Sequence, residues 1–282
     1  MIVGLSTMIF EENKSLDKLQ NFNFVKELGL RYIELSDAFN FQQNVLNALK
    51  KDNLKVFSIH ADYIDSDISS PDENKRKNGI NDAIQRINYL NKLNGNLLVI
   101  HPGGWYSNKN EEKERIKNCI NSLEIIFKKA KLQQFKDIKI AIENLPPEFF
   151  GDDIEIIKFI LEKTKEVLDL SKNNKLDNKL GICLDSGHGF LANNLYDYLN
   201  YLYNDILSMH LHDNYGDKNQ DKKEAMDDIH AVPGSGNIDW DKFFNILHNK
   251  NYQGGLIFEI KKGTKYESQI LIELKNFINN HY

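Results

Sequence analysis

The sequence predicts a single-domain (β/α)8 TIM barrel that spans residues 1–282. Three observations favour this fold class: strand-like and helix-like runs alternate eight times without a Pro/Gly/Ser-rich break, several strands are continuously apolar, and no glycine-rich phosphate loop follows the first strand. A doubly wound open sheet is the alternative, and the missing phosphate loop counts against it.

The eight predicted units follow one another along the chain, and each strand leads into one helix. Continuous apolar runs such as Leu97-Leu98-Val99-Ile100 are typical of parallel strands that are buried on both faces. Residues 110–134 carry apolar side chains at helical spacing, which predicts an amphipathic helix. We expect strands at 2–7, 31–36, 54–60, 96–101, 138–143, 180–185, 206–212 and 255–260. We expect helices at 15–28, 42–51, 72–94, 110–134, 151–170, 192–202, 239–250 and 266–280.

The composition is that of a globular protein with a well-buried core. Of the 282 residues, 41% are hydrophobic and 27% are charged. No apolar run approaches the roughly 18 residues that a membrane span needs, and the first residues lack the pattern of a signal peptide. Cys119 and Cys183 lie far apart, in a predicted helix and a predicted strand, which favours reduced core thiols. We therefore expect a cytoplasmic protein that has no membrane partner.

The charge pattern is a weak argument against extended nucleic-acid binding. The formal net charge is -5, and only four of the 36 basic residues are arginine. Arginine supplies the bidentate contacts that phosphates and base edges favour. A local basic groove is still compatible with this composition, so charge alone does not decide the ligand class.

The most informative feature is the residue at the carboxyl end of six predicted strands. Each of these strands is apolar and finishes in a histidine, an aspartate or a glutamate. In a (β/α)8 barrel the active site lies at this end of the strands, where the connecting loops converge. One such residue alone is most simply structural, but six at the same end predict a divalent-metal site. They are His60, His101, Glu143, Asp185, His210 and Glu259.

A further candidate ligand follows the sixth strand. His188 comes three residues after Asp185, and Gly187 between them permits a tight turn that aims the imidazole into the barrel mouth. Histidine and carboxylate ligands without thiolates suit zinc or manganese.

Two more candidates lie in the long connection 213–237, whose length is unusual for a loop of this fold. Near its end, Asp228 and His230 lie two residues apart, so both point to the same side of an extended stretch. Asp227 is the alternative to Asp228, although the one-residue spacer favours the latter.

Four other residues are candidates for substrate contact, and each has a simpler structural explanation. His212 faces the same side as His210 on a regular strand, so it either supports the site or is a satisfied structural histidine. Trp105, in the loop after the fourth strand, either forms a substrate wall or anchors its loop. Gly234 and Gly236 either let backbone amides approach an anion or simply form a turn.

Three residues are assigned no part in the chemistry. His248 and His281 fall on the last predicted helices, so we expect both on the surface. Glu34, in the second predicted strand, is either a supporting or a surface carboxylate.

Five motifs resemble the xylose isomerase-like TIM-barrel superfamily, and together they extend over nearly the whole chain. This superfamily contains sugar and sugar-phosphate isomerases and epimerases, and also the endonuclease-IV type nucleases that cleave DNA at abasic sites. The motifs are Ile100-His101-Pro102-Gly103-Gly104, Ile142-Glu143-Asn144-Leu145-Pro146, Gly181-Ile182-Cys183-Leu184-Asp185-Ser186-Gly187-His188, Met209-His210-Leu211-His212-Asp213 and Pro233-Gly234-Ser235-Gly236-Asn237-Ile238-Asp239-Trp240.

The resemblance to the nuclease branch implies three zinc ions. All nine ligand positions of that branch are filled here, and Tyr63 falls where it places an aromatic side chain against the DNA. The nine residues form three groups, which are Glu143, Asp185, His210 and Glu259; His60 and His101 with Glu143 as a bridge; and His188, Asp228 and His230.

The resemblance to the isomerases and epimerases implies a different use of the same mouth. Those members typically hold one metal with the residues that match Glu143, Asp185, His210 and Glu259. Glu143 and Glu259 would then exchange protons with carbon on opposite sides of a sugar, and His188 would contact that sugar.

Two departures from the nuclease branch bear on the substrate. That branch carries Asn-Asp-x-Lys after the seventh-strand histidine, whereas this chain has His212-Asp213-Asn214-Tyr215. Its second loop carries an arginine that enters DNA, whereas Ser36-Asp37-Ala38-Phe39-Asn40 contains no basic residue.

We therefore favour a divalent-metal-dependent isomerase or epimerase that acts on a sugar or sugar phosphate through an enediolate. The alternative is a zinc-dependent abasic-site endonuclease that uses all three groups and has DNA as its partner. A barrel that binds metal without catalysis is a third option. We expect one to three ions of zinc or manganese as cofactors.

Overall fold

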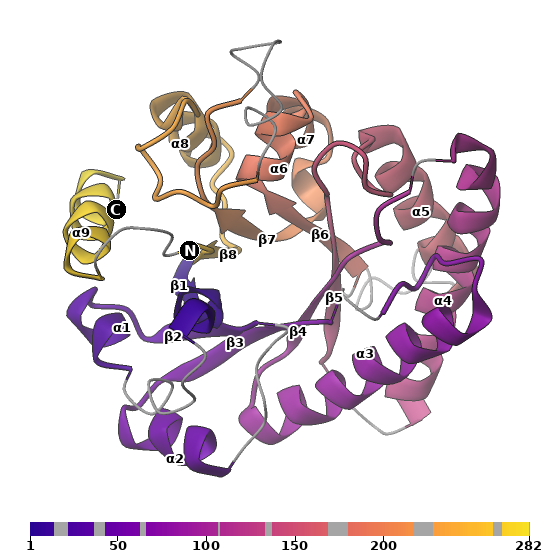
Figure 1. Cartoon of the computed structure of the whole chain (residues 1–282), viewed down its shortest axis with the longest axis horizontal. Coiled ribbons are helices and arrows are strands. Elements are labelled where there is room, and N and C mark those ends of the chain that lie inside the picture. Colours follow the sequence, from indigo (N-terminus) through magenta and orange to yellow (C-terminus); the bar gives the residue numbers. More distant parts are fainter. Residues whose placement is uncertain are drawn as a thin grey trace.

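Eight parallel strands close into a barrel in the order of the chain (Figure 1). The computed structural model describes residues 1–13, 22–36, 43–62, 66–106, 108–132, 137–168, 180–216, 228–261 and 267–281. The strands are β1 Ile2–Ser6, β2 Tyr32–Leu35, β3 Lys55–His60, β4 Leu97–Ile100, β5 Lys139–Glu143, β6 Leu180–Asp185, β7 Ile206–Leu211 and β8 Gly255–Phe258. Because β8 pairs with β1, the ring has no open edge, and the predicted (β/α)8 barrel is confirmed.

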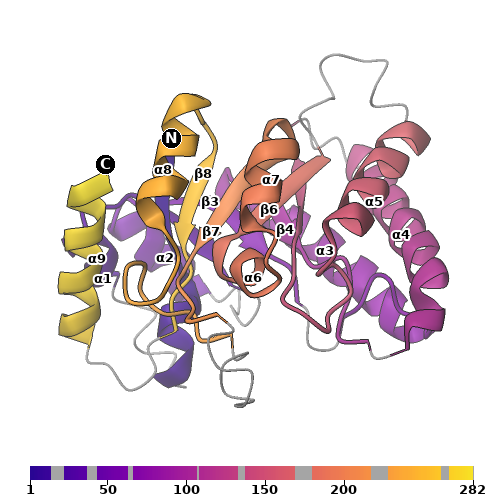
Figure 2. The ribbon, with the colours of Figure 1, turned by 90° about the horizontal axis from the view of Figure 1, so that it is seen from above.

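Helices surround the barrel and cover its outer face. Their bounds are α1 Asn23–Glu27, α2 Gln43–Lys51, α3 Glu73–Leu93, α4 Glu112–Leu132, α5 Ile154–Val167, α6 Ser186–Leu191, α7 Leu195–Tyr201, α8 Trp240–Asn249 and α9 Glu267–His281. Short 3-10 helices occur at η1 Thr7–Asn13, η3 Lys109–Glu111 and η5 Tyr203–Asp205. Helix α4 packs against both α3 and α5 along one flank of the barrel (Figure 2).

Aspartate side chains define where three of the outer helices begin. The side chains of Asp72, Asp153 and Asp239 accept hydrogen bonds from backbone amides in the first turns of α3, α5 and α8. Such a cap satisfies an otherwise unpaired amide and stabilises a helix by about 1 kcal/mol.

The alternation of side chains along the strands produces two apolar clusters. Leu98, Ile100 and Ile142 belong to the large cluster that includes the outer helices. Val99 and Ala141, on the opposite faces of the same strands, belong to a small separate cluster inside the barrel. The strands are therefore buried on both faces, as their continuous apolar runs predict.

The strand register brings the polar strand ends to one level. Asp185 at the end of β6 pairs with His210 of β7, and Glu143 ends β5. His101 and Glu259 directly follow the last residues of β4 and β8. The barrel mouth therefore collects these side chains from strands that are far apart in sequence.

Helix α6 differs from the sequence-based expectation of a glycine turn after the sixth strand. Asp185 caps this helix by accepting the amide of His188 at 2.7 Å, so His188 extends from a first helical turn. Gly187 lies within the helix, and a Cβ atom there would overlap the ring of His212. The turn prediction was wrong because the glycine provides space for a neighbouring imidazole.

The other predicted elements occur, with ends that differ by a few residues. Of the helix expected at 15–28, the structure shows α1, and residues 14–21 lie outside the described part. Cys119 and Cys183 are both buried and free, as expected for core thiols. None of the described helices is both long and apolar enough to traverse a bilayer.

Candidate metal centre at the barrel mouth

The structure brings the nine candidate ligands together in three neighbouring groups. Within each group the potential ligand atoms all lie within 4.8 Å of one another. We call them the central group (Glu143, Asp185, His210 and Glu259), the side group (His60, His101 and Glu143) and the loop group (His188, His212, Asp228 and His230). The grouping is the one that the resemblance implies, with His212 added; metal binding by these residues stays a prediction.

The central group converges on one imidazole nitrogen. His210 Nδ1 lies 3.2 Å from Glu143 Oε1, 3.2 Å from Glu259 Oε2 and 3.8 Å from Asp185 Oδ2. All four side chains are almost completely buried. Three carboxylates this close together repel one another unless a cation lies between them.

Glu143 connects the central group to the side group. Its Oε1 faces His210, whereas its Oε2 lies 2.9 Å from His60 Nε2 and 3.6 Å from His101 Nε2. One carboxylate whose two oxygens face two ligand groups has the geometry of a bridge between two ions.

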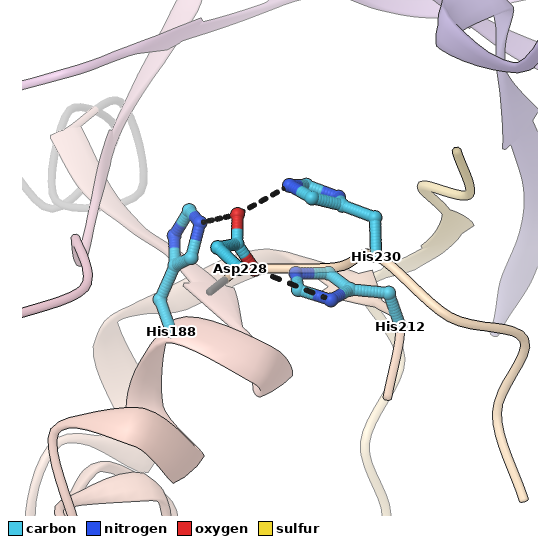
Figure 3. A group of neighbouring side chains, drawn as sticks. All are labelled: His188, His212, Asp228 and His230. Carbon is cyan, nitrogen blue, oxygen red and sulfur yellow. Dashed lines mark hydrogen bonds and ion pairs between the residues drawn. The ribbon is translucent and has the colours of Figure 1, made fainter. Parts of the chain in front are cut away.

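The loop group joins helix α6, the residue that follows strand β7 and the segment before α8 around one carboxylate. Asp228 Oδ2 lies 3.1 Å from His188 Nε2 and 2.6 Å from His230 Nε2 (Figure 3). His212 completes the group, with its Nδ1 at 3.8 Å from Asp228 Oδ1. Asp228, which was preferred over Asp227 from the sequence, thus lies next to the two histidines. Asp227 lies outside the described residues.

Backbone carbonyls fix the tautomers of three of these histidines. The Nδ1 atoms of His60, His188 and His230 lie 2.7, 2.9 and 3.0 Å from the carbonyl oxygens of Ala61, Asn144 and Glu259. A carbonyl only accepts, so each Nδ1 carries the hydrogen and each Nε2 is free to bind a cation. This is the usual arrangement behind a metal-ligating histidine, so the residues fit divalent zinc or manganese.

The pKa values show how strongly charge is concentrated here. Burial raises the pKa of Glu143, but His210 and the side-group histidines outweigh burial and hold that pKa well below its usual range. Burial lowers the pKa of His60, but Glu143 outweighs it and raises the pKa to about 9. His101 has a lowered pKa because burial dominates there. Strongly perturbed groups in one cleft are typical of a functional site.

A cavity of about 250 Å3 opens above these groups. Its described lining includes Glu143, Glu259, His60, His101, His188 and His230, together with Met8, Leu145, Pro146, Phe149, Asp228 and Lys261. A larger cavity of about 640 Å3 lies at the opposite end of the barrel, beside the first residues of the strands, and contains none of the ligand groups. Because catalysis in this fold occurs at the carboxyl ends of the strands, the smaller cavity is the candidate site.

None of the described residues among the five predicted substrate contacts lines the cavity. Tyr63 lies outside the described residues. Trp105 is 60% exposed and His212 is fully buried, and neither lines the cavity as described. The amide of Gly234 donates to Asp213 at 2.8 Å, and a Cβ atom at Gly236 would overlap the same carboxylate. These two glycines therefore pack around Asp213, which leaves the Gly234 amide unavailable to an anion.

The two remaining histidines also differ from each other. His248 is exposed, as expected. His281 is only partly exposed, because its ring packs against Phe244 and Phe277 and its Nδ1 donates to the carbonyl of Phe277. The surface prediction for His281 was therefore wrong in part.

Glu34, which was assigned no part from the sequence, lies buried behind the central group. It is fully buried, its Oε1 lies 2.9 Å from His210 Nε2, and its Oε2 accepts a hydrogen bond of 2.6 Å from Ser58. Its signal in the sequence is a charged residue inside the apolar strand Tyr32-Ile33-Glu34-Leu35.

Comparison with known proteins decides the family. The sequence profile of the xylose isomerase-like TIM barrel matches residues 22–280. The chain belongs to the xylose isomerase-like TIM barrel family. Its membership agrees with the closed eight-stranded barrel and with ligand groups at the carboxyl ends of the strands.

Relatives within this family carry different descriptions. A protein of Mycoplasma capricolum named probable endonuclease 4 is 27% identical over 256 residues, which cover 86% of this chain and 80% of that protein. An uncharacterized protein of Methanocaldococcus jannaschii is 26% identical over 304 residues, which cover 99% of this chain and 91% of that protein.

Solved structures with the same fold include sugar epimerases. A D-tagatose 3-epimerase-like protein has a TM-score of 0.77 at 22% identity, with 100% of this chain and 97% of that chain covered. The 3-keto-D-glucoside 4-epimerase of E. coli has a TM-score of 0.74 at 19% identity, with 99% of each chain covered. At these identities the likeness shows the fold.

Proposed function

We propose that this xylose isomerase-like barrel is a divalent-metal-dependent isomerase or epimerase of sugars or sugar phosphates. The observation that carries the proposal is the small cavity, about 250 Å3, into which two carboxylates of the central group open. This volume lies just below the usual range for small-molecule sites, about 300–1000 Å3, and suits a compact polar substrate.

The two glutamates are the candidate acid and base. Glu143 ends β5 and Glu259 follows β8, and both line the cavity while His210 lies buried behind them. Burial raises the pKa of Glu259, but His210 outweighs burial and lowers it, so both carboxylates are ionised at neutral pH. One carboxylate can remove the proton from one face of a sugar carbon, and the other, after it has taken up a proton from solvent water, can donate that proton to the opposite face.

The metal ion would supply the electrophile. Held by the central group, a zinc or manganese ion would polarise adjacent carbonyl and hydroxyl oxygens and so would make the carbon-bound hydrogen more acidic. His188 lines the same cavity with its ring fixed by the carbonyl of Asn144, so the imidazole forms a rigid part of the cavity wall. Phe149 and Leu145 provide the apolar part of the lining, which excludes water from the reacting carbon.

Lys261 supports phosphorylated sugars as substrates. It is the one lysine among the described residues that line the cavity, and its Nζ lies 3.3 Å from the carbonyl oxygen of Asp228. An ammonium group at the rim can pair with a terminal phosphate. We therefore include sugar phosphates alongside free ketoses in the substrate class.

Abasic-site phosphodiester hydrolysis is the second candidate. It is favoured by the complete set of nine ligand residues and by relatives that carry the name probable endonuclease 4. Two positions favour a sugar over DNA as the substrate. His212 replaces the asparagine of the nuclease motif and is fully buried, so it is not available to contact DNA. Tyr215 replaces the lysine of that motif, which removes a basic side chain. Asp213 is common to both sequences, and here it is buried and accepts the indole hydrogen of Trp240 at 2.9 Å.

The discriminating experiment compares the two substrate classes on one preparation. Full-length protein loaded with zinc or manganese is assayed for epimerisation of ketopentoses, ketohexoses and their phosphates, and for incision of a duplex that contains an abasic site. We expect turnover of a sugar and no incision. Robust incision without sugar turnover would reverse the assignment. Glu143→Gln is the inactive control, and it shows that either activity comes from this protein.

A further inference from the structure

His212 is a buried histidine that the proposed reaction does not use. Its side chain is fully enclosed, and its Nε2 lies 2.8 Å from Asp185 Oδ1. A carboxylate only accepts, so Nε2 carries the hydrogen, and Nδ1 keeps a lone pair. Nδ1 has no hydrogen-bond partner among the described residues. A buried nitrogen lone pair without a donor is costly, which points to a missing cation.

The direction of this nitrogen identifies where the cation would lie. Nδ1 faces the loop group, at 3.8 Å from Asp228 Oδ1, and its ring stacks on that of His230 with centroids 3.9 Å apart and an interplanar angle of 17°. In Figure 3 the imidazoles of His188, His212 and His230 surround the carboxylate of Asp228. Three imidazoles and one carboxylate thus approach a common point.

The other two imidazoles present the matching nitrogens. His188 and His230 each use Nδ1 to donate to a backbone carbonyl, and both direct Nε2 to Asp228. All three rings therefore have one nitrogen fixed by an outer acceptor and the other directed inward. Outer acceptors of this kind set the tautomer of histidines that ligate metals.

The backbone is shaped to allow this arrangement. His230 has a φ of 46°, in the left-handed region that is costly for residues other than glycine. Gly187 lets the ring of His212 approach helix α6, since any side chain at this position would overlap the imidazole. Backbone strain at His230 and the glycine beside His212 both favour this arrangement of side chains, and both are typical of a functional site.

We propose that His212 is the fourth ligand of a closed zinc site formed with His188, Asp228 and His230. Four protein ligands fill a tetrahedral zinc ion, which is the usual coordination of a structural zinc site. The ion links the segment before α8 to helix α6 and to the end of strand β7, which His212 directly follows. It thereby fixes Asp228 and His230 in the cavity wall and leaves no coordination position for a phosphodiester. This inference concerns the loop group alone and does not depend on the sugar reaction.

The first test uses the wild-type protein and reads the ligands directly. The full-length chain is labelled with nitrogen-15, loaded with cadmium-113, and examined by NMR for scalar coupling between cadmium and histidine nitrogens. We expect one cadmium nucleus coupled to three imidazoles, through Nε2 of two rings and Nδ1 of the third. The central group offers one imidazole and the side group two, so the pattern is specific. A spectrum in which no cadmium couples to more than two imidazoles overturns the proposal.

The second test measures affinity. Metal-free wild-type, His212→Asn and His248→Asn proteins are titrated with cobalt, whose visible absorption is intense when it has four ligands. Asparagine keeps a polar side chain at position 212 but has no imidazole nitrogen, and His248 is an exposed control. We expect His212→Asn to lose the intense absorption that one equivalent of cobalt contributes and to bind that equivalent about 10- to 100-fold more weakly, while His248→Asn matches the wild type. Wild-type absorption and affinity in His212→Asn would refute the fourth ligand, whether or not the protein epimerises a sugar.

Discussion

Glu34 Oε1 lies 2.9 Å from His210 Nε2, and both side chains are completely buried. Neither atom has a hydrogen-bond partner elsewhere among the described residues, so the Glu34 carboxylate and the His210 imidazole are paired with each other. On the opposite side of the ring, His210 Nδ1 faces the carboxylates of the central group. A carboxylate behind a ligating histidine orients the ring and increases its basicity.

Glu34→Gln should therefore weaken metal binding at the central group without removing any ligand. Loss of the charge behind His210 lowers affinity by about 10- to 100-fold, the usual effect of removing such a supporting carboxylate. Competition with a chromophoric chelator measures the change. Glu27→Gln, an exposed glutamate on α1, is the matched control. Equal affinity in the two variants would show that Glu34 merely fills space.

Glu143→Gln should abolish activity, because Glu143 contributes to two ligand groups and lies in the cavity wall. An amide is neither a bridging anion nor a proton acceptor, so we expect a loss of at least about 100-fold in kcat together with weaker metal binding. The exposed Glu162→Gln is the control. Wild-type turnover by Glu143→Gln, measured with the same sugar, would place the active site elsewhere.

Gly187→Ala should destabilise the protein by about 1–3 kcal/mol, the typical cost of inserting a methyl group into a packed site. The new Cβ would overlap the His212 ring and displace it from Asp185. Gly104→Ala is the control, because its Cβ would meet only ordinary contacts with Asp67. Denaturant unfolding of both variants provides the comparison, and equal free energies of unfolding would disprove the packing argument.

The metal-free protein should lose stability as the pH rises from 6.5 toward 10. Burial lowers the pKa of both His60 and His188, but the facing carboxylates outweigh burial and raise these values to about 9 and about 10. Both pKa values exceed the pKa of about 6.5 that histidine has in the unfolded chain. The protonated rings therefore contribute their full stabilisation below pH 6.5, and this contribution disappears as the pH rises through 9 to 10.

Thermal melts in the presence of a chelator test this pH dependence. The Tm of the metal-free protein should fall across this range, and the gap between zinc-loaded and metal-free Tm should widen because protons no longer compete with zinc. The His60→Gln variant should show a smaller fall. A metal-free Tm that stays constant or rises from pH 6.5 to 9.5 would contradict the assigned pKa directions.

Strand ends were predictable from the sequence because the pattern is local. An apolar run that finishes in His60 or Glu143 identifies both a buried strand and the end that faces the mouth. The barrel, its strand order and the convergence of the nine ligand residues all follow from that pattern together with the family motifs.

Contacts across the barrel were not predictable in the same way. Glu34 contacts His210 because β2 and β7 face each other across the barrel interior. The stagger of the strands determines which residues meet there, and the spacing of residues along the sequence does not reveal it. Gly187 seemed to indicate a turn because glycine is a poor helix former, but the space that His212 requires outweighs this local preference.

Hydrogen exchange at carbon tests the central claim most directly. Zinc- or manganese-loaded protein is incubated in deuterium oxide with a ketose that it turns over, or with that ketose phosphate, and the sugar is examined by NMR. Proton transfer through Glu143 and Glu259 predicts deuterium at the carbon next to the carbonyl, and none with Glu143→Gln. No deuterium in any sugar, together with incision of an abasic-site duplex by the same preparation, would contradict the account.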